Sequence, residues 1–383
     1  MKNITHRTAK KLGTKPSPRQ LFAGFARILI PKSKLGKIFA GVIYGFILLN
    51  IIVMFAVARW YISSNSKVAL ELGTTFVPNY ARYLGVDPKE TLNAIINDLD
   101  IDRVRLVSYW KDIEVAPGKY NFDELDWQFR MAEEHGTDVS LAIGMRQPRW
   151  PECHEPDWID AAQPRELWQP QLEAFISAVI SRYKDSPALV SYQLENEYFL
   201  SVFGKCKNFD RQRLVDEHAL VKRLDPSTKL IISRSNNWTV ASGFPVGDPR
   251  ADEFGVSVYK RVWDVTITKR YFEYPIPPWF YSVLAGGGKI LTDKDLMIHE
   301  LQAEAWTPTG YEINSAPVDE LYKSMNPDRL KKRIKYAADT GMRTVDTWGA
   351  EWWYQMKVKR GEPGLWNTAK EEFKYWRDRY NGQ

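Results

Sequence analysis

The sequence contains few of the side chains on which metal and thiol chemistry depend. Its 383 residues include two cysteines and five histidines. Neither Cys153-His154 nor Cys206 has the paired ligand spacing that is typical of a zinc site. The sequence therefore gives no support for a metal centre, and we expect this protein to use no metal and no other cofactor.

Acidic residues are absent from residues 1–37, which contain ten lysines and arginines. Removing these ten from the 53 basic residues of the whole chain leaves 43, against 47 acidic residues, so the formal charge changes from +6 to −4. No basic stripe remains downstream to meet phosphate groups, and we expect no nucleic-acid partner.

Charges of either sign are also missing from Ile38 to Ala58. This run is long enough to cross a hydrocarbon core of ~30 Å as a helix. The basic residues before it predict a cytoplasmic N-terminus and an extracytoplasmic remainder, in a single-pass protein of the cell membrane. A cleaved signal peptide is the alternative, because Ala56-Val57-Ala58 has the small-x-small pattern of a cleavage site. The predicted parts are a basic cytoplasmic tail (1–37), a transmembrane helix (38–58), a tether (59–68) and a catalytic domain (69–383).

Strand-like apolar runs alternate with helical patterns after residue 69, as is typical of βαβ units around a parallel sheet. The candidate strands are 70–77, 104–109, 139–144, 189–196, 230–234, 255–259, 296–300 and 344–348. The candidate helices are 88–99, 124–135, 167–184, 211–224, 327–338 and 368–380. Residues 271–288, rich in proline, glycine and aromatic residues, are predicted as a loop with one helical turn. Eight strands with intervening helices predict an α/β fold, the (β/α)8 TIM barrel. An open doubly wound sheet is the alternative, but its glycine-rich phosphate loop is missing after the first strand.

Polar side chains follow several predicted strands, where a barrel carries its reactive groups. The strand ends carry Arg105, Asn196, Glu197, Tyr259, Glu300 and Trp348. Glu197 and Glu300 come from different strands, and a facing pair of carboxyl groups is the minimal machinery for cleaving a glycosidic bond. An acidic surface loop is the alternative for residues 195–197. Buried carboxyl groups cost folding free energy, which favours the catalytic interpretation.

These segments resemble the barrel enzymes of glycoside hydrolase clan A over roughly residues 70–355. Residues 193–198, Gln-Leu-Glu-Asn-Glu-Tyr, resemble the strand-four signature of that clan, especially that of the family 35 and family 42 β-galactosidases. The resemblance implies that Glu197 is the acid/base and that Asn196 binds the sugar 2-hydroxyl group. Residues 104–110 and 114–126 are similar to strand two and the loop after it, residues 297–300 to strand seven, and residues 347–349 to strand eight.

The same resemblance implies that Arg105 supports the nucleophile Glu300 and that Trp348 forms the floor of the −1 subsite. It further implies retention of configuration, with the two carboxyl groups about 5–5.5 Å apart. Glu304 remains an alternative nucleophile. Glu195 should share the strand face of Glu197 by period-two alternation, as a neighbouring support residue.

Aromatic residues are abundant, with 15 tryptophans and 19 tyrosines. Flat apolar rings suit the C–H faces of sugars, so we expect a carbohydrate partner, an oligo- or polysaccharide. Candidate contacts in the loops after the strands are Trp110, Trp150, Asn237 and Trp306. Tyr259 could hydrogen-bond the nucleophile or lie in the core as a packing residue.

Cys153 and Cys206 fall in the loops after the third and fourth predicted strands. In an exported domain they could form a disulfide bond, and two free thiols are the alternative. His299 precedes Glu300 on a strand, so its side chain should point to the opposite face and pack behind the barrel.

Taken together, the sequence predicts a membrane-anchored retaining glycoside hydrolase, with Glu197 as acid/base, Glu300 as nucleophile and β-galactosidase-like features. A transglycosylase with the same site is one alternative. A non-catalytic glycan-binding receptor on a glycosidase-like barrel is the other.

Overall fold

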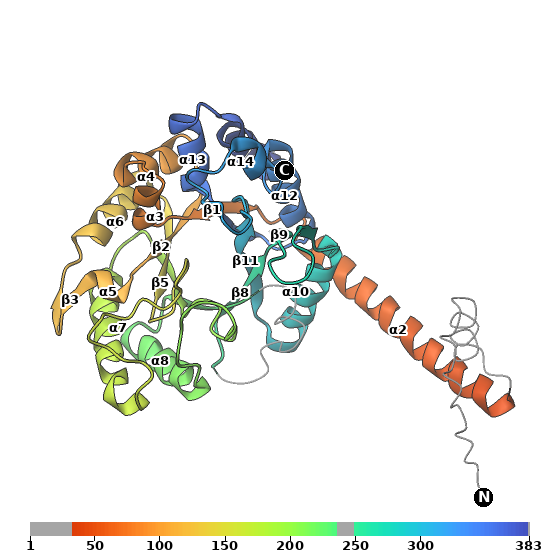
Figure 1. The fold of residues 1–383 in the computed structure, drawn as a ribbon. Coiled ribbons are helices and arrows are strands. Elements are labelled where there is room, and N and C mark those ends of the chain that lie inside the picture. Colours follow the sequence, from red (N-terminus) through yellow and green to blue (C-terminus); the bar gives the residue numbers. More distant parts are fainter. Residues whose placement is uncertain (1–32, 236–248, 382–383) are drawn as a thin grey trace, which may run out of the picture. The chain divides into compact units, whose positions relative to one another are not determined.

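The computed structural model describes residues 33–235 and 249–381. Eight parallel strands form its centre: β1 (Glu71–Thr75), β2 (Arg103–Val107), β5 (Asp138–Ile143), β6 (Leu189–Leu194), β7 (Lys229–Arg234), β8 (Glu253–Val258), β11 (Asp295–Gln302) and β12 (Thr344–Trp348). They close in the order β1–β12–β11–β8–β7–β6–β5–β2, each hydrogen-bonded to the next. Each strand coincides with one of the predicted apolar runs, and the predicted (β/α)8 barrel is confirmed (Figure 1).

Helices surround the strands and form the outer layer of the barrel (Figure 1). Those between and after the strands are α3 (Pro78–Tyr83), α4 (Pro88–Asn97), α5 (Trp110–Ile113), α6 (Asp123–His135), the 3₁₀ turn η1 (Arg165–Leu167), α7 (Gln169–Tyr183), α8 (Arg211–Leu224), α10 (Pro278–Thr292), α11 (Val318–Tyr322), α12 (Pro327–Asp339), α13 (Ala350–Lys359) and α14 (Gly364–Asn381). Two short hairpins, β3 (Glu114–Ala116) with β4 (Lys119–Tyr120) and β9 (Arg261–Trp263) with β10 (Tyr271–Glu273), lie in loops.

The core lies between the strands and the inner faces of these helices. In α7, Leu172, Phe175, Ile176 and Val179 repeat at helical spacing and are all fully buried. Each such side chain contributes about 1.5–3 kcal/mol when it leaves water. This apolar stripe therefore holds the helix against the sheet. The polar groups described below lie at the carboxyl ends of the strands, outside this apolar layer.

Helix α10 contradicts the prediction of a loop with one helical turn over residues 271–288. It is a regular helix of 15 residues. The glycines at 286–288 lower its intrinsic helix propensity, which is why the sequence pattern is weak there. A Cβ atom on Gly286 would lie 2.8 Å from Val57 Cγ1 and 3.1 Å from Tyr61 Cβ. Close packing against Val57 and Tyr61 therefore explains why position 286 is a glycine, although helix propensity alone disfavours one.

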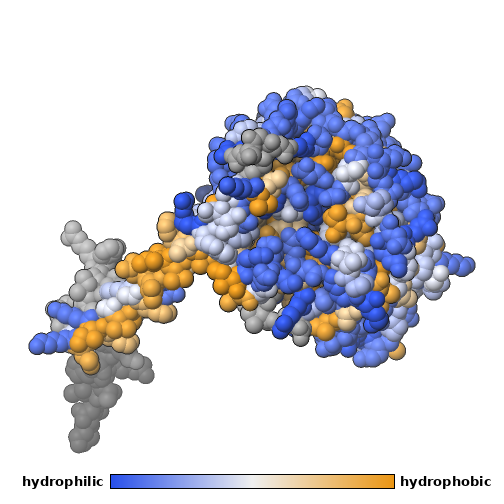
Figure 2. All heavy atoms as spheres, turned by 180° about the vertical axis from the view of Figure 1, so that it is seen from behind, coloured by the Kyte–Doolittle hydropathy of each residue, from blue (hydrophilic) through white to orange (hydrophobic). Residues whose placement is uncertain are grey.

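Helix α2 (Lys34–Ser64) precedes the barrel. By length and composition it is able to cross a membrane, and Figure 2 shows hydrophobic residues along its surface. Contacts divide the chain into two compact units, residues 1–56 and 57–383. Within the second unit, Ala58 and Tyr61 are buried. The tether predicted over residues 59–68 is thus helical as far as Ser64.

Candidate active site

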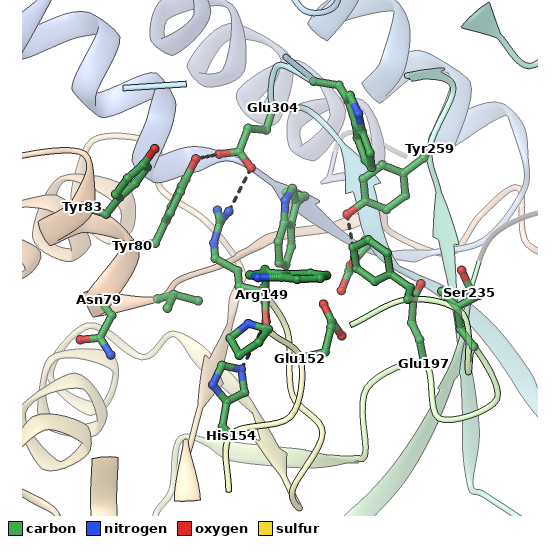
Figure 3. A pocket seen from close by; sticks show the side chains of 18 of the residues that line it. Asn79, Tyr80, Tyr83, Arg149, Glu152, His154, Glu197, Ser235, Tyr259 and Glu304 are labelled. Atoms are coloured by element: carbon green, nitrogen blue, oxygen red, sulfur yellow. Dashed lines mark hydrogen bonds and ion pairs between the residues drawn. The ribbon is translucent and has the colours of Figure 1, made fainter. Parts of the chain in front are cut away.

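A cleft of about 790 Å³ opens at the carboxyl ends of the strands. Figure 3 shows carboxyl groups, tyrosines and an arginine side chain converging on it. The polar and aromatic lining residues are Asn79, Tyr80, Tyr83, Tyr109, Lys111, Arg149, Trp150, Glu152, His154, Glu197, Phe203, Ser235, Tyr259, Tyr274, Glu300, Glu304, Trp306, Glu312 and Trp348.

Glu300 lies near the end of β11 and is 4% exposed. Its Oε1 accepts a hydrogen bond from Arg105 Nη2 at 2.8 Å, and its Oε2 accepts one from the hydroxyl of Tyr259 at 2.8 Å. Burial alone would raise the pKa of Glu300. The adjacent Arg105 charge and these donors outweigh it and hold the pKa below its usual range. Glu300 is therefore an ionised carboxylate, held in place from two sides.

Glu197 follows β6, and its backbone is left-handed with φ 44°. The amide of Glu197 donates to Ser233 Oγ at 2.8 Å, and the hydroxyl of Ser257 donates to its Oε1. Burial raises the pKa of Glu197 to about 8, and the negative charge of Glu300 contributes further. Glu197 is therefore protonated at neutral pH.

Arg105 connects the two carboxyl groups through the barrel interior. Beside its bond to Glu300, its Nη1 donates to Gln193 Oε1 and its Nε to Thr75 Oγ1, both at 2.9 Å. Gln193 Nε2 in turn donates to Ser233 Oγ at 2.9 Å, the hydroxyl that receives the amide of Glu197. One network thus fixes the carboxyl groups of two different strands.

Asn196, a predicted substrate contact, is 3% exposed and is not among the residues that line the cleft. Its Oδ1 accepts from Gln193 Nε2 at 2.9 Å, and its Nδ2 donates to Glu152 Oε2 at 3.0 Å. Like Glu312, Glu152 is a further carboxyl group of the cleft that the sequence did not predict. Its position in an irregular loop before Cys153 gave no periodic signal; only the proximity to a strand end could have drawn attention to it.

Glu304 forms an ion pair that crosses the barrel mouth. Its carboxylate accepts from Arg149 Nη1 at 3.1 Å and from the hydroxyl of Tyr80. Arg149 follows β5 and Glu304 follows β11, which lie on opposite sides of the closed barrel. The guanidinium carbon of Arg149 lies 3.2 Å from the ring centroid of Tyr80 and 4.4 Å from that of Trp348. Both oxygens of Glu304 are thereby committed to this bridge.

Four of the predicted aromatic contacts line the cleft: Tyr259, Trp348, Trp150 and Trp306. Trp110 does not.

Trp110 is fully buried. Its indole N–H donates to Glu114 Oε2 at 2.5 Å, and its ring stacks on that of Phe175 with the ring centroids 5.8 Å apart. It therefore belongs to the core rather than to a sugar platform. Asn237 lies outside the described residues.

Glu195 and His299, which are close in sequence to Glu197 and Glu300, do not lie where the period-two alternation of a strand predicts. Glu195 has φ 50°, so β6 has ended before it. Its carboxylate is directed to Met145 N (2.6 Å) and Arg213 Nη1 (3.0 Å), not along the face of Glu197.

His299 was expected behind the barrel, but the pairing of β11 with β8 shifts by one residue between Ile298 and Glu300. This bulge breaks the alternation. His299 Nε2 therefore lies 3.8 Å from Glu300 Oε1. Burial lowers the pKa of His299 to about 3, so the ring is neutral.

Cys153 and Cys206 form a disulfide bond, with a Cα–Cα distance of 5.3 Å. It joins the loop after β5, which carries Glu152, to the loop after β6, which carries Glu197. Within residues 33–235 and 249–381, no cluster of three or more His, Cys, Asp or Glu side chains is arranged to hold a metal ion.

No family model matches the sequence, and no curated protein matches it. Solved structures do resemble the fold. A GH5_18 protein from Bifidobacterium longum in complex with Manβ1-4GlcNAc has a TM-score of 0.56 at 12% identity, over 80% of this chain and 78% of that one. A GH5_18 protein from Streptomyces cattleya in complex with GlcNAc has a TM-score of 0.55 at 13% identity, over 81% and 80%. Xylanase 10B from Thermotoga maritima has a TM-score of 0.51 at 14% identity, over 82% and 98%. The chain thus has the (β/α)8 barrel fold of the clan A glycosidases.

Proposed function

We propose that this protein is a membrane-anchored, extracytoplasmic glycoside hydrolase that cleaves O-glycosidic bonds with retention of configuration. Glu197 is the acid/base and Glu300 the nucleophile. The observation that supports this proposal is that two carboxyl groups of one cleft have pKa values shifted in opposite directions. A general acid has to be protonated and a nucleophile ionised before the reaction begins.

In the first step, Glu197 gives its proton to the leaving oxygen while the carboxylate of Glu300 bonds to the anomeric carbon, and the glycosidic C–O bond breaks. The resulting glycosyl ester removes the negative charge of Glu300 and so lowers the pKa of Glu197. In the second step, ionised Glu197 takes a proton from water, and the water oxygen displaces Glu300.

Arg105 and Tyr259 hold the nucleophile in position, because each donates to a different oxygen of Glu300. An attacking oxygen whose partners are fixed loses little entropy in the reaction. Trp348 and Trp306 provide apolar rings in the same cleft for the C–H faces of a sugar.

The substrate is an oligo- or polysaccharide. The strand-four segment resembles that of β-galactosidases, and similar barrels were solved with Manβ1-4GlcNAc and GlcNAc. β-Galactosides and β-mannosides are therefore the first substrates to test. The anchor is α2, whose uncharged run begins at Ile38, and the ten basic residues before that run favour a cytoplasmic N-terminus.

The test is turnover of a panel of nitrophenyl glycosides by residues 57–383, which keep the end of α2 that packs on the barrel. We expect release from one sugar, abolished in Glu300→Ala. In Glu197→Ala we expect a loss of about 10²- to 10⁴-fold that azide partly restores. Glu304→Gln is the matched control and should retain turnover.

Two outcomes would contradict the assignment. Loss of turnover in Glu304→Gln as complete as in Glu300→Ala would move the nucleophile to Glu304. Sugar binding without turnover from any aryl or polymeric glycan would identify a receptor. Product analysis with added acceptor sugars separates hydrolysis from transglycosylation.

A further inference from the structure

Three carboxyl groups that line the cleft are not used by the catalytic steps: Glu152, Glu304 and Glu312. Glu304 is bound to Arg149 and Tyr80, and Glu312 to the hydroxyl of Tyr83, which leaves Glu152 for closer attention. We propose that Glu152 is a substrate contact that selects the sugar: it accepts a hydrogen bond from a hydroxyl group of the unit bound against the acid/base. This inference rests on the proposed function, because it assumes a carbohydrate ligand in this cleft.

Glu152 is placed for such a contact. It lines the cleft together with Glu197 and Glu300. Figure 3 shows its carboxyl group between Arg149 and Glu197, on the side of the cleft where the acid/base lies. A sugar unit that contacts Glu197 therefore also lies close to Glu152.

The carboxyl group of Glu152 is only half used by the protein. Its Oε2 accepts from Asn196 Nδ2 at 3.0 Å and lies 3.6 Å from Arg146 Nη2. Its Oε1 accepts no hydrogen bond from the residues that the structure describes. The second oxygen is thus available to a ligand donor, and sugar hydroxyls are such donors.

The backbone holds Glu152 in a conformation that costs free energy. Its φ of 75° is left-handed, which a residue other than glycine rarely adopts. The amide of Glu152 donates to the carbonyl of Arg149, and its own carbonyl accepts from the amide of Gln147, both at 2.8 Å. A Cβ atom on Gly204 would lie 2.7 Å from Glu152 Cβ, so the neighbouring loop is shaped around this side chain.

A purely structural role would not require these features. An amide side chain could serve Asn196 equally well, whereas Glu152 combines 4% exposure, an acidic group and a strained backbone. Burial raises the pKa of Glu152 to about 7, so the group is costly to ionise until a donor is bound. Strain and buried charge of this kind are typical of ligand contacts.

The test is a double-mutant cycle in which one change is made in the protein and the other in the substrate. The best nitrophenyl glycoside and its set of monodeoxy analogues are compared in wild type, Glu152→Ala and Glu152→Gln, by kcat/KM and KM separately. We expect Glu152→Ala to lose about 10- to 100-fold in kcat/KM on the full sugar. The analogue without the contacted hydroxyl should lose nothing further, and Glu152→Gln should recover part of the loss.

Glu351→Gln is the matched control. Glu351 is also buried, its pKa is also raised to about 7, and it pairs with Arg149 at 3.7 Å without lining the cleft. It should leave discrimination among the deoxy sugars unchanged. Thermal unfolding of every variant shows whether it is folded.

The same comparison is repeated in the Glu300→Gln background, with the affinity for each sugar measured by calorimetry. This readout does not depend on turnover. If the wild type turns over no glycoside, but Glu152→Ala weakens binding through one hydroxyl group, the proposed function is overturned and the contact is supported. If Glu152→Ala weakens the affinity for every deoxy analogue equally, or if no sugar binds at all, the proposed contact is overturned.

Discussion

Glu197 and Glu300 illustrate how neighbours decide the state of a carboxyl group. Both are buried in one cleft, and both receive hydrogen bonds. Glu300 has a guanidinium group at 2.8 Å, whereas Glu197 has the hydroxyl of Ser257 and the negative charge of Glu300. The difference in charge, not in burial, separates the two pKa values.

The first prediction concerns stability. The pKa of Glu197 is about 8 in the folded protein and ~4.3 when unfolded, so its ionisation lowers the free energy of unfolding as pH rises between these values. Glu197→Gln should therefore raise the melting temperature, by more at pH 8 than at pH 5. Thermal unfolding across this pH range checks it.

Glu300→Gln is its matched control and should act in the opposite direction. It leaves Arg105 buried without its carboxylate, at a cost of roughly 3 kcal/mol at pH 7. Because the pKa of Glu300 is lowered in the folded protein, this stabilisation exists above its unfolded pKa and is lost as pH falls. Equal effects of both substitutions at every pH would contradict the assigned states.

The second prediction concerns the pH dependence of kcat/KM. The proposed mechanism requires protonated Glu197, so the alkaline limb should fall near pH 8, while the acid limb should lie below the ordinary pKa of glutamate. Measurement of kcat/KM from pH 3 to 10 gives both limbs. In azide-rescued Glu197→Ala the alkaline limb should be missing, and its persistence would assign it to another group.

At the scale of elements, two glycines of α10 provide a matched comparison. Gly286→Ala places a methyl group 2.8 Å from Val57 Cγ1 and should lower the stability of residues 57–383. At Gly287 a Cβ atom would meet nothing within 4 Å, so Gly287→Ala should stabilise the helix by about 0.5–1 kcal/mol. Denaturant unfolding of both variants tests the contact between α10 and the end of α2. A gain in both would show that the contact is loose.

The strands of the barrel were predictable from sequence, because each is a short apolar run and the core dictates such runs. Helix α10 was not, because Gly286 packs against Val57 and Tyr61, which lie far earlier in the chain. His299 and Glu195 were misplaced for a related reason: a bulge and a left-handed residue interrupt an alternation that the sequence does not mark. Trp110 follows a strand end as a sugar platform would, but α7 lies over it.

At the scale of the whole molecule, the disulfide joins two loops of the barrel mouth across 53 residues. Closing a loop of this length restricts the unfolded chain and stabilises the fold by about 4 kcal/mol in the entropic model. Reductant should therefore lower the free energy of unfolding of residues 57–383 by up to this amount. It should have no effect on the Cys153→Ser/Cys206→Ser variant. An unchanged wild type would indicate free thiols.

The positions of the two carboxyl groups followed from the sequence, because strand ends of a barrel meet at one mouth. Glu152 and the pairing of Arg149 with Glu304 did not, since they depend on how irregular loops after β5 and β11 fold toward each other. Loop conformation is set by contacts between distant segments, which leave no period in the chain.

The pairing of Cys153 with Cys206 also has a consequence for biosynthesis. Two cysteines can form a single intramolecular bond, so oxidation within one chain has one possible product. Such a chain needs an oxidase where it matures but no isomerase to correct mispairing. Production in a reducing compartment would deliver the protein without this crosslink, whereas translocation into an oxidising one completes it in a single step.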